Sequence, residues 1–336
     1  MYNSPYHTAD LSQYSFLITG GAGFIGSNLV MYLLKYGARR VRVLDNLSTG
    51  HLKNIGDYLS NPSFEFVQGD IRSYETCQAA TADMDFVLHQ AALGSVPRSI
   101  VDPITTNEVN VSGFLNMLMS VKKSSVKRMV YAASSSTYGD SIALPKVEDK
   151  IGNPLSPYAV TKYVNELYAN VFARTYNMEL TGLRYFNVFG PGQDPHGAYA
   201  AVIPKFVNLL LNHQSPVING DGSFSRDFTY VENVVQANML ALFVQDSPAV
   251  NTVYNVAYGE QTSLNLLVQT LKKYLSESDP SISEIPVIYG SGREGDIPHS
   301  LASIEKASKN LGYAPRYNFT EGLRVSVQWY KEHNEV

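Results

Sequence analysis

Residues 15–26 read SFLITGGAGFIG, and this stretch decides the fold of the chain. Its first five residues form an apolar run that suits a buried parallel strand. After the glycines, Leu29, Leu33 and Leu34 repeat at helical spacing. A strand, a glycine turn and a helix in this order make up a dinucleotide-binding fingerprint. The glycines permit a tight turn and let a pyrophosphate reach the helix N-terminus, where free N–H groups and the helix dipole favour negative charge.

The second predicted strand, residues 40–44, is followed by an acidic residue. Asp45 stands 19 residues after Gly26, close to the spacing of about 20 that accompanies this fingerprint. A carboxylate at this point binds ribose hydroxyls and would repel a 2′-phosphate. The sequence therefore predicts a site for NAD rather than NADP.

The composition is that of a globular protein, with 336 residues of which 44 % are hydrophobic and 17 % charged, and this length favours two domains. A formal net charge of −4 gives no electrostatic reason to expect nucleic-acid binding. No apolar stretch approaches the roughly 20 residues of a membrane span, and residues 1–13 lack a signal-peptide pattern, so we expect a cytoplasmic protein. The seven histidines lack metal-ligand spacing and Cys77 is the single cysteine, so we expect neither a metal site nor an internal disulfide.

Apolar strand patterns alternate with helical patterns through the first half of the chain. Strands are predicted at residues 64–67, 86–89 and 129–133, and a long helix at about 107–123. Each strand is followed by small or polar residues, as expected where ligands bind at the carboxyl ends of parallel strands. These patterns predict an α/β fold with a doubly wound parallel Rossmann sheet.

We place the NAD-binding Rossmann domain at residues 1–186, because the chain becomes richer in Pro, Gly and Asn beyond this point. Residues 187–336 are expected to form mainly a smaller C-terminal α/β domain that binds the substrate. Residues 228–258 are expected to return to the first domain, through a helix at 231–244 and a strand at 253–256.

Tyr158 and Lys162 form the clearest candidate for reactive chemistry. Ser156 and Pro157 predict a helix that begins just before Tyr158, so these two side chains lie one turn apart on one face. A phenol has a reference pKa of about 10, and a neighbouring ammonium favours its ionised form. A second positive charge would lower this pKa further. A surface helix can carry the same pattern, but the predicted hydride acceptor gives the pair a use as the proton acceptor for an alcohol.

Several features together resemble the extended short-chain dehydrogenase/reductase family over essentially the whole chain: residues 20–26, Asp45, Asp70-Ile71, Ser134, the Tyr158–Lys162 pair and residues 184–190. Within that family the chain looks most like a nucleotide-sugar 4-epimerase. Residues 89–99 and 197–204 are similar to the bacterial branch that acts on UDP-N-acetylhexosamines, the UDP-GlcNAc/UDP-GalNAc 4-epimerases.

The resemblance implies reversible C4 epimerisation of UDP-GlcNAc to UDP-GalNAc through a 4-keto sugar, with NAD tightly bound. It makes Tyr158 the base, has Lys162 bind the nicotinamide ribose and lower the pKa of Tyr158, and has Ser134 bind the 4-hydroxyl. Ser135 and Ser136 stand where sugar 4,6-dehydratases carry an Asp–Glu pair or a Glu. Two serines do not supply the acid and base that loss of water requires, which argues against a dehydratase.

The resemblance assigns cofactor contacts to Gly20, Gly23, Phe24, Ile25, Gly26, Asp45, Asn46, Ser48, Thr49, Gly50, Asp70, Ile71, Gln90, Ala91, Ala92, Tyr158, Lys162, Tyr185 and Val188. It assigns substrate contacts to Gly94, Ser95, Ser134, Ser135, Ser136, Tyr158, Asn187, Ala201, Val202, Lys205, Ile218, Asn219, Arg226, Arg293, Asp296 and Ser300. Two guanidinium groups in this second set suit a pyrophosphate, and they belong to Arg226 and Arg293. Ala201 and Ser300 are smaller than the Asn and Tyr of many UDP-galactose 4-epimerases, which leaves room for an acetamido group.

Other functions stay open at this point. The chain could be a UDP-glucose/UDP-galactose 4-epimerase, or a UDP-uronate 4-epimerase in which Arg98 meets the substrate carboxylate. It could also be a dinucleotide-sensing regulator or a net dehydrogenase on the same fold. The resemblance further implies a homodimer through helices of the first domain, and supply of UDP-GalNAc-type donors for surface polysaccharide.

Overall fold

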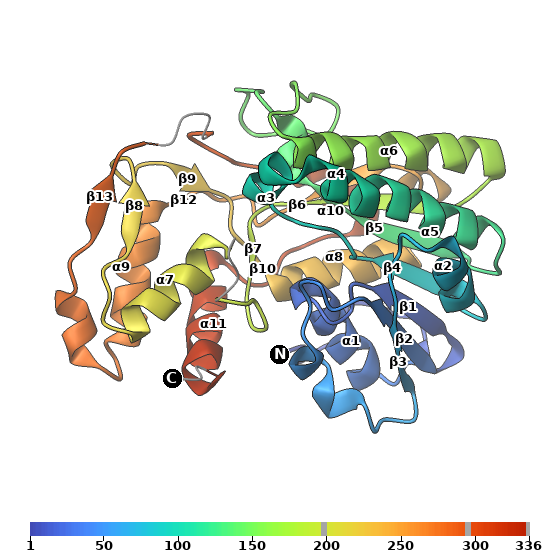
Figure 1. Ribbon diagram of the computed structural model, residues 1–336, viewed down its shortest axis with the longest axis horizontal. Coiled ribbons are helices and arrows are strands. Elements are labelled where there is room, and N and C mark those ends of the chain that lie inside the picture. The colour runs from blue at the N-terminus through green and yellow to red at the C-terminus, as the bar shows by residue number, and fades with distance from the viewer. Residues whose placement is uncertain (196–199, 293–296, 334–336) are drawn as a thin grey trace.

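The computed structural model describes residues 1–195, 200–292 and 297–333. A seven-stranded parallel sheet lies at its centre (Figure 1). The order is β11-β6-β5-β4-β1-β2-β3, with bounds β1 Ser15–Thr19, β2 Arg40–Asp45, β3 Phe64–Gln68, β4 Phe86–His89, β5 Arg128–Ser134, β6 Leu180–Tyr185 and β11 Val253–Val256. All neighbouring strands are parallel. The chain reverses its direction of winding between β1 and β4, the point where doubly wound sheets bind ligands. The predicted α/β fold is confirmed.

Helices cover both faces of this sheet. On one face α1 packs against α8, and on the other face α2, α5 and α6 lie together; their bounds are α1 Phe24–Lys35, α8 Val231–Phe243, α2 Tyr74–Thr81, α5 Gly113–Lys122 and α6 Pro157–Tyr176. Each face has its own buried apolar cluster. Cys77 lies in the second cluster, where burial raises the pKa of its thiol to about 12. It is therefore an inert packed residue.

A smaller lobe lies beside the sheet and has its own apolar core. It contains α7 Val202–Leu211, α9 Leu264–Leu275 and α11 Phe319–His333, with three two-stranded pairs: β8 Val217–Asn219 with β13 Ile288–Gly290, β9 Ser225–Arg226 with β12 Thr262–Ser263, and β7 Val188–Phe189 with β10 Thr229–Tyr230. The helix α10, Glu305–Leu311, packs on β11 and α8 instead. The domain limits at residues 186 and 187 stay a prediction.

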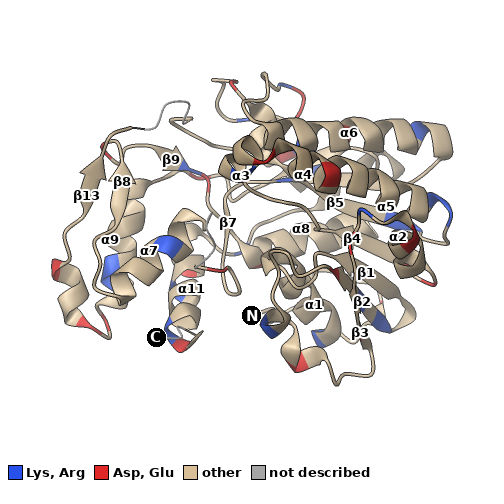
Figure 2. Ribbon diagram, in the orientation of Figure 1, with Lys and Arg blue, Asp and Glu red and all other residues tan. Residues whose placement is uncertain are grey.

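Short helices occupy several connections: η1 Leu11–Gln13, η2 Leu52–Asn54, η3 Gly56–Tyr58, α3 Val96–Val101, α4 Pro103–Asn107, η4 Glu108–Ser112, η5 Ser135–Tyr138, η6 Ser247–Ala249 and η7 Pro280–Glu284. In the described part of the chain, no helix has both the length and the apolar character needed to cross a bilayer. Figure 2 shows Lys and Arg interspersed with Asp and Glu over the visible side of both lobes.

Two helix predictions are confirmed, the second with a local irregularity. The helix expected from Ser156 and Pro157 is α6, and the Ser156 side chain caps it by accepting a hydrogen bond from the N–H of Ala159 at 3.1 Å. The long helical segment expected at about 107–123 is confirmed as a continuous run through α4, η4 and α5. Glu108–Ser112 forms a π-helical turn within it, a detail that apolar spacing does not register.

A buried ion pair joins α6 to β6. The Nε and Nη2 atoms of Arg184 lie 2.8 and 2.7 Å from the two carboxylate oxygens of Glu166. The remaining Nη1 donates to the carbonyl oxygen of Glu148 at 2.9 Å. Removing one partner of such a buried pair leaves an uncompensated charge, which typically costs about 3–5 kcal/mol.

We predict that Glu166→Ala lowers the free energy of unfolding by about 3–5 kcal/mol, because the Arg184 charge stays buried without a partner. Urea unfolding followed by circular dichroism measures this change. Glu277→Ala is the control, because Glu277 pairs with Arg324 at the surface, where such pairs contribute about 0–1 kcal/mol. Equal losses in the two variants would contradict the prediction.

Candidate active site

The glycine turn after β1 brings the backbone unusually close to α1. Gly20 has a φ of +68°, and a Cβ at this residue would lie 2.7 Å from the backbone N of Ala91. A Cβ at Gly26 would lie 2.2 Å from the carbonyl oxygen of Gly20. Gly23 precedes α1 and supplies no side-chain cap, so the first N–H groups of this helix are available to an anion.

Asp45, the last residue of β2, lies beside this turn. One carboxylate oxygen accepts the N–H of Ala22 at 2.9 Å and the other accepts the N–H of Leu47 at 2.8 Å. A carboxylate oxygen has a second lone pair, so both oxygens can still accept hydrogen bonds from a ribose. The turn and this carboxylate therefore fit the pyrophosphate and ribose of NAD.

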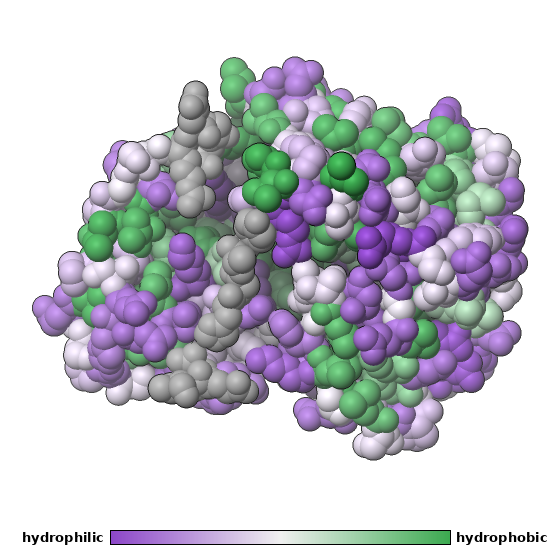
Figure 3. All heavy atoms as spheres, in the orientation of Figure 1, coloured by the Kyte–Doolittle hydropathy of each residue, from purple (hydrophilic) through white to green (hydrophobic). Residues whose placement is uncertain are grey.

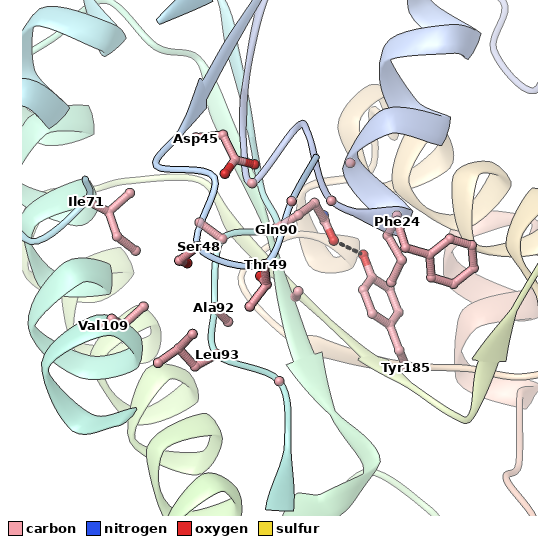
Figure 4. A pocket seen from close by; sticks show the side chains of 18 of the residues that line it. Phe24, Asp45, Ser48, Thr49, Ile71, Gln90, Ala92, Leu93, Val109 and Tyr185 are labelled. Carbon is pink, nitrogen blue, oxygen red and sulfur yellow. Dashed lines mark hydrogen bonds between the residues drawn. The ribbon is translucent and has the colours of Figure 1, made fainter. Parts of the chain in front are cut away.

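A cavity of about 570 Å³ opens over the carboxyl ends of the strands (Figure 4). All the residues to which the resemblance assigned cofactor contacts line it, and so do Ser134, Ser135, Gly94 and Asn187. Whether each contacts bound NAD stays a prediction.

Sequence reasoning missed seven further lining residues: Leu44, Gly69, Leu93, Val109, Ala132, Ala133 and Gln193. Five of these adjoin a predicted site residue or precede one by two positions near a strand end, so strand position could have indicated them. Val109 and Gln193 come from the π-helical turn and from a loop, and local pattern gives no signal for either.

The candidate reactive groups meet where β5 ends against α6. Ser134 is the last residue of β5, it lines the cavity together with Tyr158, and its side chain lowers the pKa of the Tyr158 phenol. The Lys162 ammonium donates to the carbonyl oxygen of Ala132 at 2.8 Å and lies 6.0 Å from the centre of the Tyr158 ring. The hydroxyl of Ser136 donates to Ser134 Oγ at 2.9 Å, and Ser136 does not line the cavity. Among the three neighbouring serines, this geometry favours Ser134.

The pKa of the Tyr158 phenol is shifted upward in the protein alone, whereas a neighbouring ammonium would lower it. Burial raises the pKa of the phenol, and the hydrogen bond with Ser134 lowers it only in part. Burial also lowers the pKa of Lys162 to about 8. Burial is therefore the larger influence on the Tyr158 pKa in the protein alone, and the role of Lys162 in lowering this pKa stays a prediction. A second positive charge is therefore needed, and oxidised NAD supplies one in its nicotinamide ring.

His89 lies close to these groups but does not compete as a base. It ends β4, and its Nδ1 is 2.7 Å from the Thr19 hydroxyl. Burial, together with the charge of Lys162, lowers the pKa of His89 to about 3. The imidazole is therefore neutral at ordinary pH and has a structural role beneath the cavity.

Most of the residues predicted to contact the substrate do not line this cavity: Ser95, Ser136, Ala201, Val202, Lys205, Ile218, Asn219, Arg226 and Ser300. Ser95 caps α3, and Ala201, Val202 and Lys205 lie at the start of α7. The strand β8 carries Ile218 and Asn219. Arg226 and Ser300 are close together, because Arg226 Nη1 donates to the carbonyl oxygen of Pro298 and the N–H of Ser300 donates to that of Ser225. Arg293 and Asp296 lie outside the described residues.

Comparison with known proteins agrees with this geometry. The NAD dependent epimerase/dehydratase family matches residues 16–257. A UDP-glucose 4-epimerase of Mycolicibacterium smegmatis is 34 % identical over 322 residues, which cover 95 % of this chain and 99 % of that protein. A UDP-glucuronate 4-epimerase of Thermodesulfobacterium geofontis is 31 % identical over 330 residues, or 96 % and 97 % of the two chains.

A solved structure is similar over nearly its whole length. It is the UDP-N-acetylglucosamine 4-epimerase of Methanobrevibacter ruminantium in complex with UDP-N-acetylmuramic acid, with 38 % identity and a TM-score of 0.87. The match covers 95 % of this chain and 98 % of that one. These relatives are all named as 4-epimerases of UDP-sugars, and they differ in the sugar that they are named for. With its glycine turn, Asp45 and the Ser134–Tyr158–Lys162 group, the chain belongs to the NAD dependent epimerase/dehydratase family.

Proposed function

We propose that this NAD-dependent nucleotide-sugar 4-epimerase acts on UDP-N-acetylhexosamines and interconverts UDP-GlcNAc and UDP-GalNAc. The observation that carries the chemistry is that Ser134, Tyr158 and Lys162 line the cofactor cavity together. The observation that carries the sugar preference is the small side chain at Ala201 and at Ser300.

Tyr158 removes the proton from the 4-hydroxyl of the sugar and later returns it. Bound NAD would supply the acceptor for the hydride of C4 and the donor that returns this hydride to the opposite face of the 4-keto sugar. Ser134 hydrogen-bonds both the phenol and the sugar hydroxyl, and it orients the proton transfer between them. Lys162 is held in place by the carbonyl oxygen of Ala132, and its charge favours the phenolate.

The preference for an N-acetyl sugar follows from side-chain volume. Ser300 lies on a segment bound to β9, next to Arg226, whose guanidinium suits a pyrophosphate. A serine there leaves space beside the sugar for a 2-acetamido group, and the methyl group of Ala201 gives it an apolar contact. A UDP-glucose/UDP-galactose epimerase is the second candidate, favoured by the named activity of the Mycolicibacterium smegmatis relative. A UDP-uronate epimerase is the third, favoured in the same way by the Thermodesulfobacterium geofontis relative.

We also propose that the protein forms a homodimer through α3, α4 and α6. Apolar side chains are exposed on these neighbouring helices, among them Ile104, which is 73 % exposed, and Leu167, which is 50 % exposed. Figure 3 shows apolar groups gathered over α3 and α4. A second copy that covers this patch would remove it from water, the usual reason for a grouped apolar surface. The patch adjoins the start of α6, so a dimer would also stabilise the segment that carries Tyr158.

We predict that Tyr158→Phe lowers kcat by about 10²–10⁴-fold, the usual contribution of a positioned proton acceptor. Product formation from UDP-GlcNAc is followed by NMR, and NAD content is measured in the same preparation. Tyr163→Phe is the matched control, because Tyr163 is on the same helix and does not line the cavity. Turnover by Tyr158→Phe within tenfold of the parent would contradict the proposed role.

We predict that Ser300→Tyr lowers kcat/KM for UDP-GlcNAc by about 10–200-fold more than for UDP-glucose, because the phenol fills the space for the acetamido group. NMR of the products from the acetylated and plain UDP-sugars gives both values, and Ser300→Ala is the size-conserving control. Equal losses on the two sugars, or a parent enzyme that turns over only the plain sugars, would reject the N-acetyl preference.

We predict that the double variant Ile104→Glu/Leu167→Glu is monomeric, because two carboxylates per chain would be buried against each other in the dimer. Light scattering after size-exclusion chromatography measures the mass. Leu59→Glu is the control, since Leu59 is 54 % exposed and belongs to neither α3, α4 nor α6. A parent protein that is already monomeric would contradict the proposal.

A further inference from the structure

One wall of the cofactor cavity is closed by hydrogen bonds to a residue that does not line it. Asn238 lies on α8 and is fully buried. Its Nδ2 donates to the Tyr185 hydroxyl at 2.9 Å, and its Oδ1 accepts from Gln90 Nε2 at 3.3 Å. The Tyr185 hydroxyl in turn donates to Gln90 Oε1 at 3.2 Å. Gln90, Tyr185 and Asn238 therefore form a closed ring of hydrogen bonds, and the Tyr185 hydroxyl also lies 3.3 Å from Asn238 Oδ1 as a second acceptor.

The orientation of the Asn238 amide is fixed by a fourth contact. Its second Nδ2 hydrogen donates to the carbonyl oxygen of Val234 at 2.8 Å, one turn earlier on α8. Exchanging the amide nitrogen and oxygen would place Oδ1 against this carbonyl oxygen and Nδ2 against the Gln90 donor. Both contacts would then be repulsive, so the direction of the ring follows from the backbone of α8.

The other two members of the ring face the cavity. Figure 4 shows the Gln90 amide and the Tyr185 phenol pointing toward each other on the cavity wall, near Phe24 at the start of α1. They come from the ends of β4 and β6, and α8 lies behind them. Burial raises the pKa of Tyr185 to about 12, so the phenol keeps the proton that the ring requires. The ring uses one hydrogen of Gln90 Nε2 and leaves the other for an acceptor.

We propose that Asn238 is a positioning residue for NAD: it sets the direction in which Gln90 and Tyr185 present their polar groups, so that the free Nε2 hydrogen of Gln90 meets a phosphate or ribose oxygen of the cofactor. Asn238 acts through these two side chains and does not touch the cofactor. Asn238 is on α8, in the second half of the sequence. This helix would therefore influence how tightly residues such as Gln90, in the first half, bind NAD.

A merely structural role for Asn238 makes a different prediction. Asn233 is also buried on α8, and its side chain makes three hydrogen bonds: it donates to the carbonyl oxygen of Tyr317 and accepts the N–H groups of Arg316 and Tyr317. These contacts are remote from the residues that line the cavity. If buried amides on α8 only stabilise the fold, replacing either asparagine will have the same effect on NAD.

The test compares Asn238→Leu and Asn238→Ala with Asn233→Leu and Asn233→Ala in the full chain. NAD per chain is measured by absorbance and by enzymatic assay of the released cofactor, and the dissociation constant of NAD by titration into chain freed of it; melting temperature is recorded for all variants. We expect about a tenfold weaker NAD affinity for each Asn238 variant, the effect of about 1.4 kcal/mol of lost hydrogen bonding. We expect a change below twofold for each Asn233 variant, and recovery of turnover in the Asn238 variants when NAD is added.

A double-mutant comparison identifies the route. In a Gln90→Leu background, Asn238→Leu is expected to change NAD affinity by less than twofold, because the Gln90 amide that meets the cofactor is absent. The proposal is overturned if the Asn238 variants keep NAD affinity within twofold of the parent, if the Asn233 variants lose as much affinity, or if the losses at residues 90 and 238 simply add. Failure of both Asn238 variants to fold, with Asn233 variants folded, would also overturn it, because the residue would then be structural.

Discussion

The contact between the glycine turn and the first turn of α1 is the constraint on which the rest of the site depends. With the Gly20 carbonyl oxygen 2.2 Å from the place of a Cβ at Gly26, only glycine lets α1 begin so close to β1. The free N–H groups of α1 then point into the crevice between β1 and β4. Asp45 is attached to the same turn through Ala22. Because all seven strands are parallel, the ends of β4, β5 and β6 reach the same crevice.

The helix α6 supplies both chemistry and rigidity from one face. Tyr158, Lys162 and Glu166 follow each other at intervals of one turn, and the first two line the cavity while Glu166 pairs with Arg184 on β6. The ion pair therefore fixes the rotation of the helix that presents the phenol. The same burial that makes this face rigid raises the pKa of Tyr158. A positive charge that enters the cavity would favour the phenolate, so we expect ionisation of Tyr158 to depend on the oxidised cofactor.

The sequence predicted those parts of the molecule that local pattern controls. The glycine turn, Asp45 and the start of α6 at Pro157 could be read from spacing, capping and strand ends. The π-helical turn at 108–112, the cavity residue Gln193 and the role of Asn238 could not, because they depend on contacts between segments far apart in the chain. The sequence also could not predict that the pKa of Tyr158 is raised, since desolvation depends on the whole surrounding structure. The substrate side was expected from resemblance alone, and many of its residues, such as Val202, Lys205 and Ile218, lie in the smaller lobe, whose placement depends on long-range packing.

The arrangement of titratable groups explains why oxidation at this site leads back to an alcohol. Among the described residues that line the cavity, the side chains that can exchange protons are Asp45, Asp70, Tyr158, Lys162 and Tyr185. Asp45 ends β2 and Asp70 follows β3, and at least two strands, β4 and β1, separate both from the end of β5. Glu166 is paired with Arg184, and His89 stays neutral. With Tyr158 in the proposed role of base, the serines beside it do not supply the second acid–base group that loss of water from a keto sugar needs. This set of described groups therefore suits return of the hydride to C4 better than loss of water.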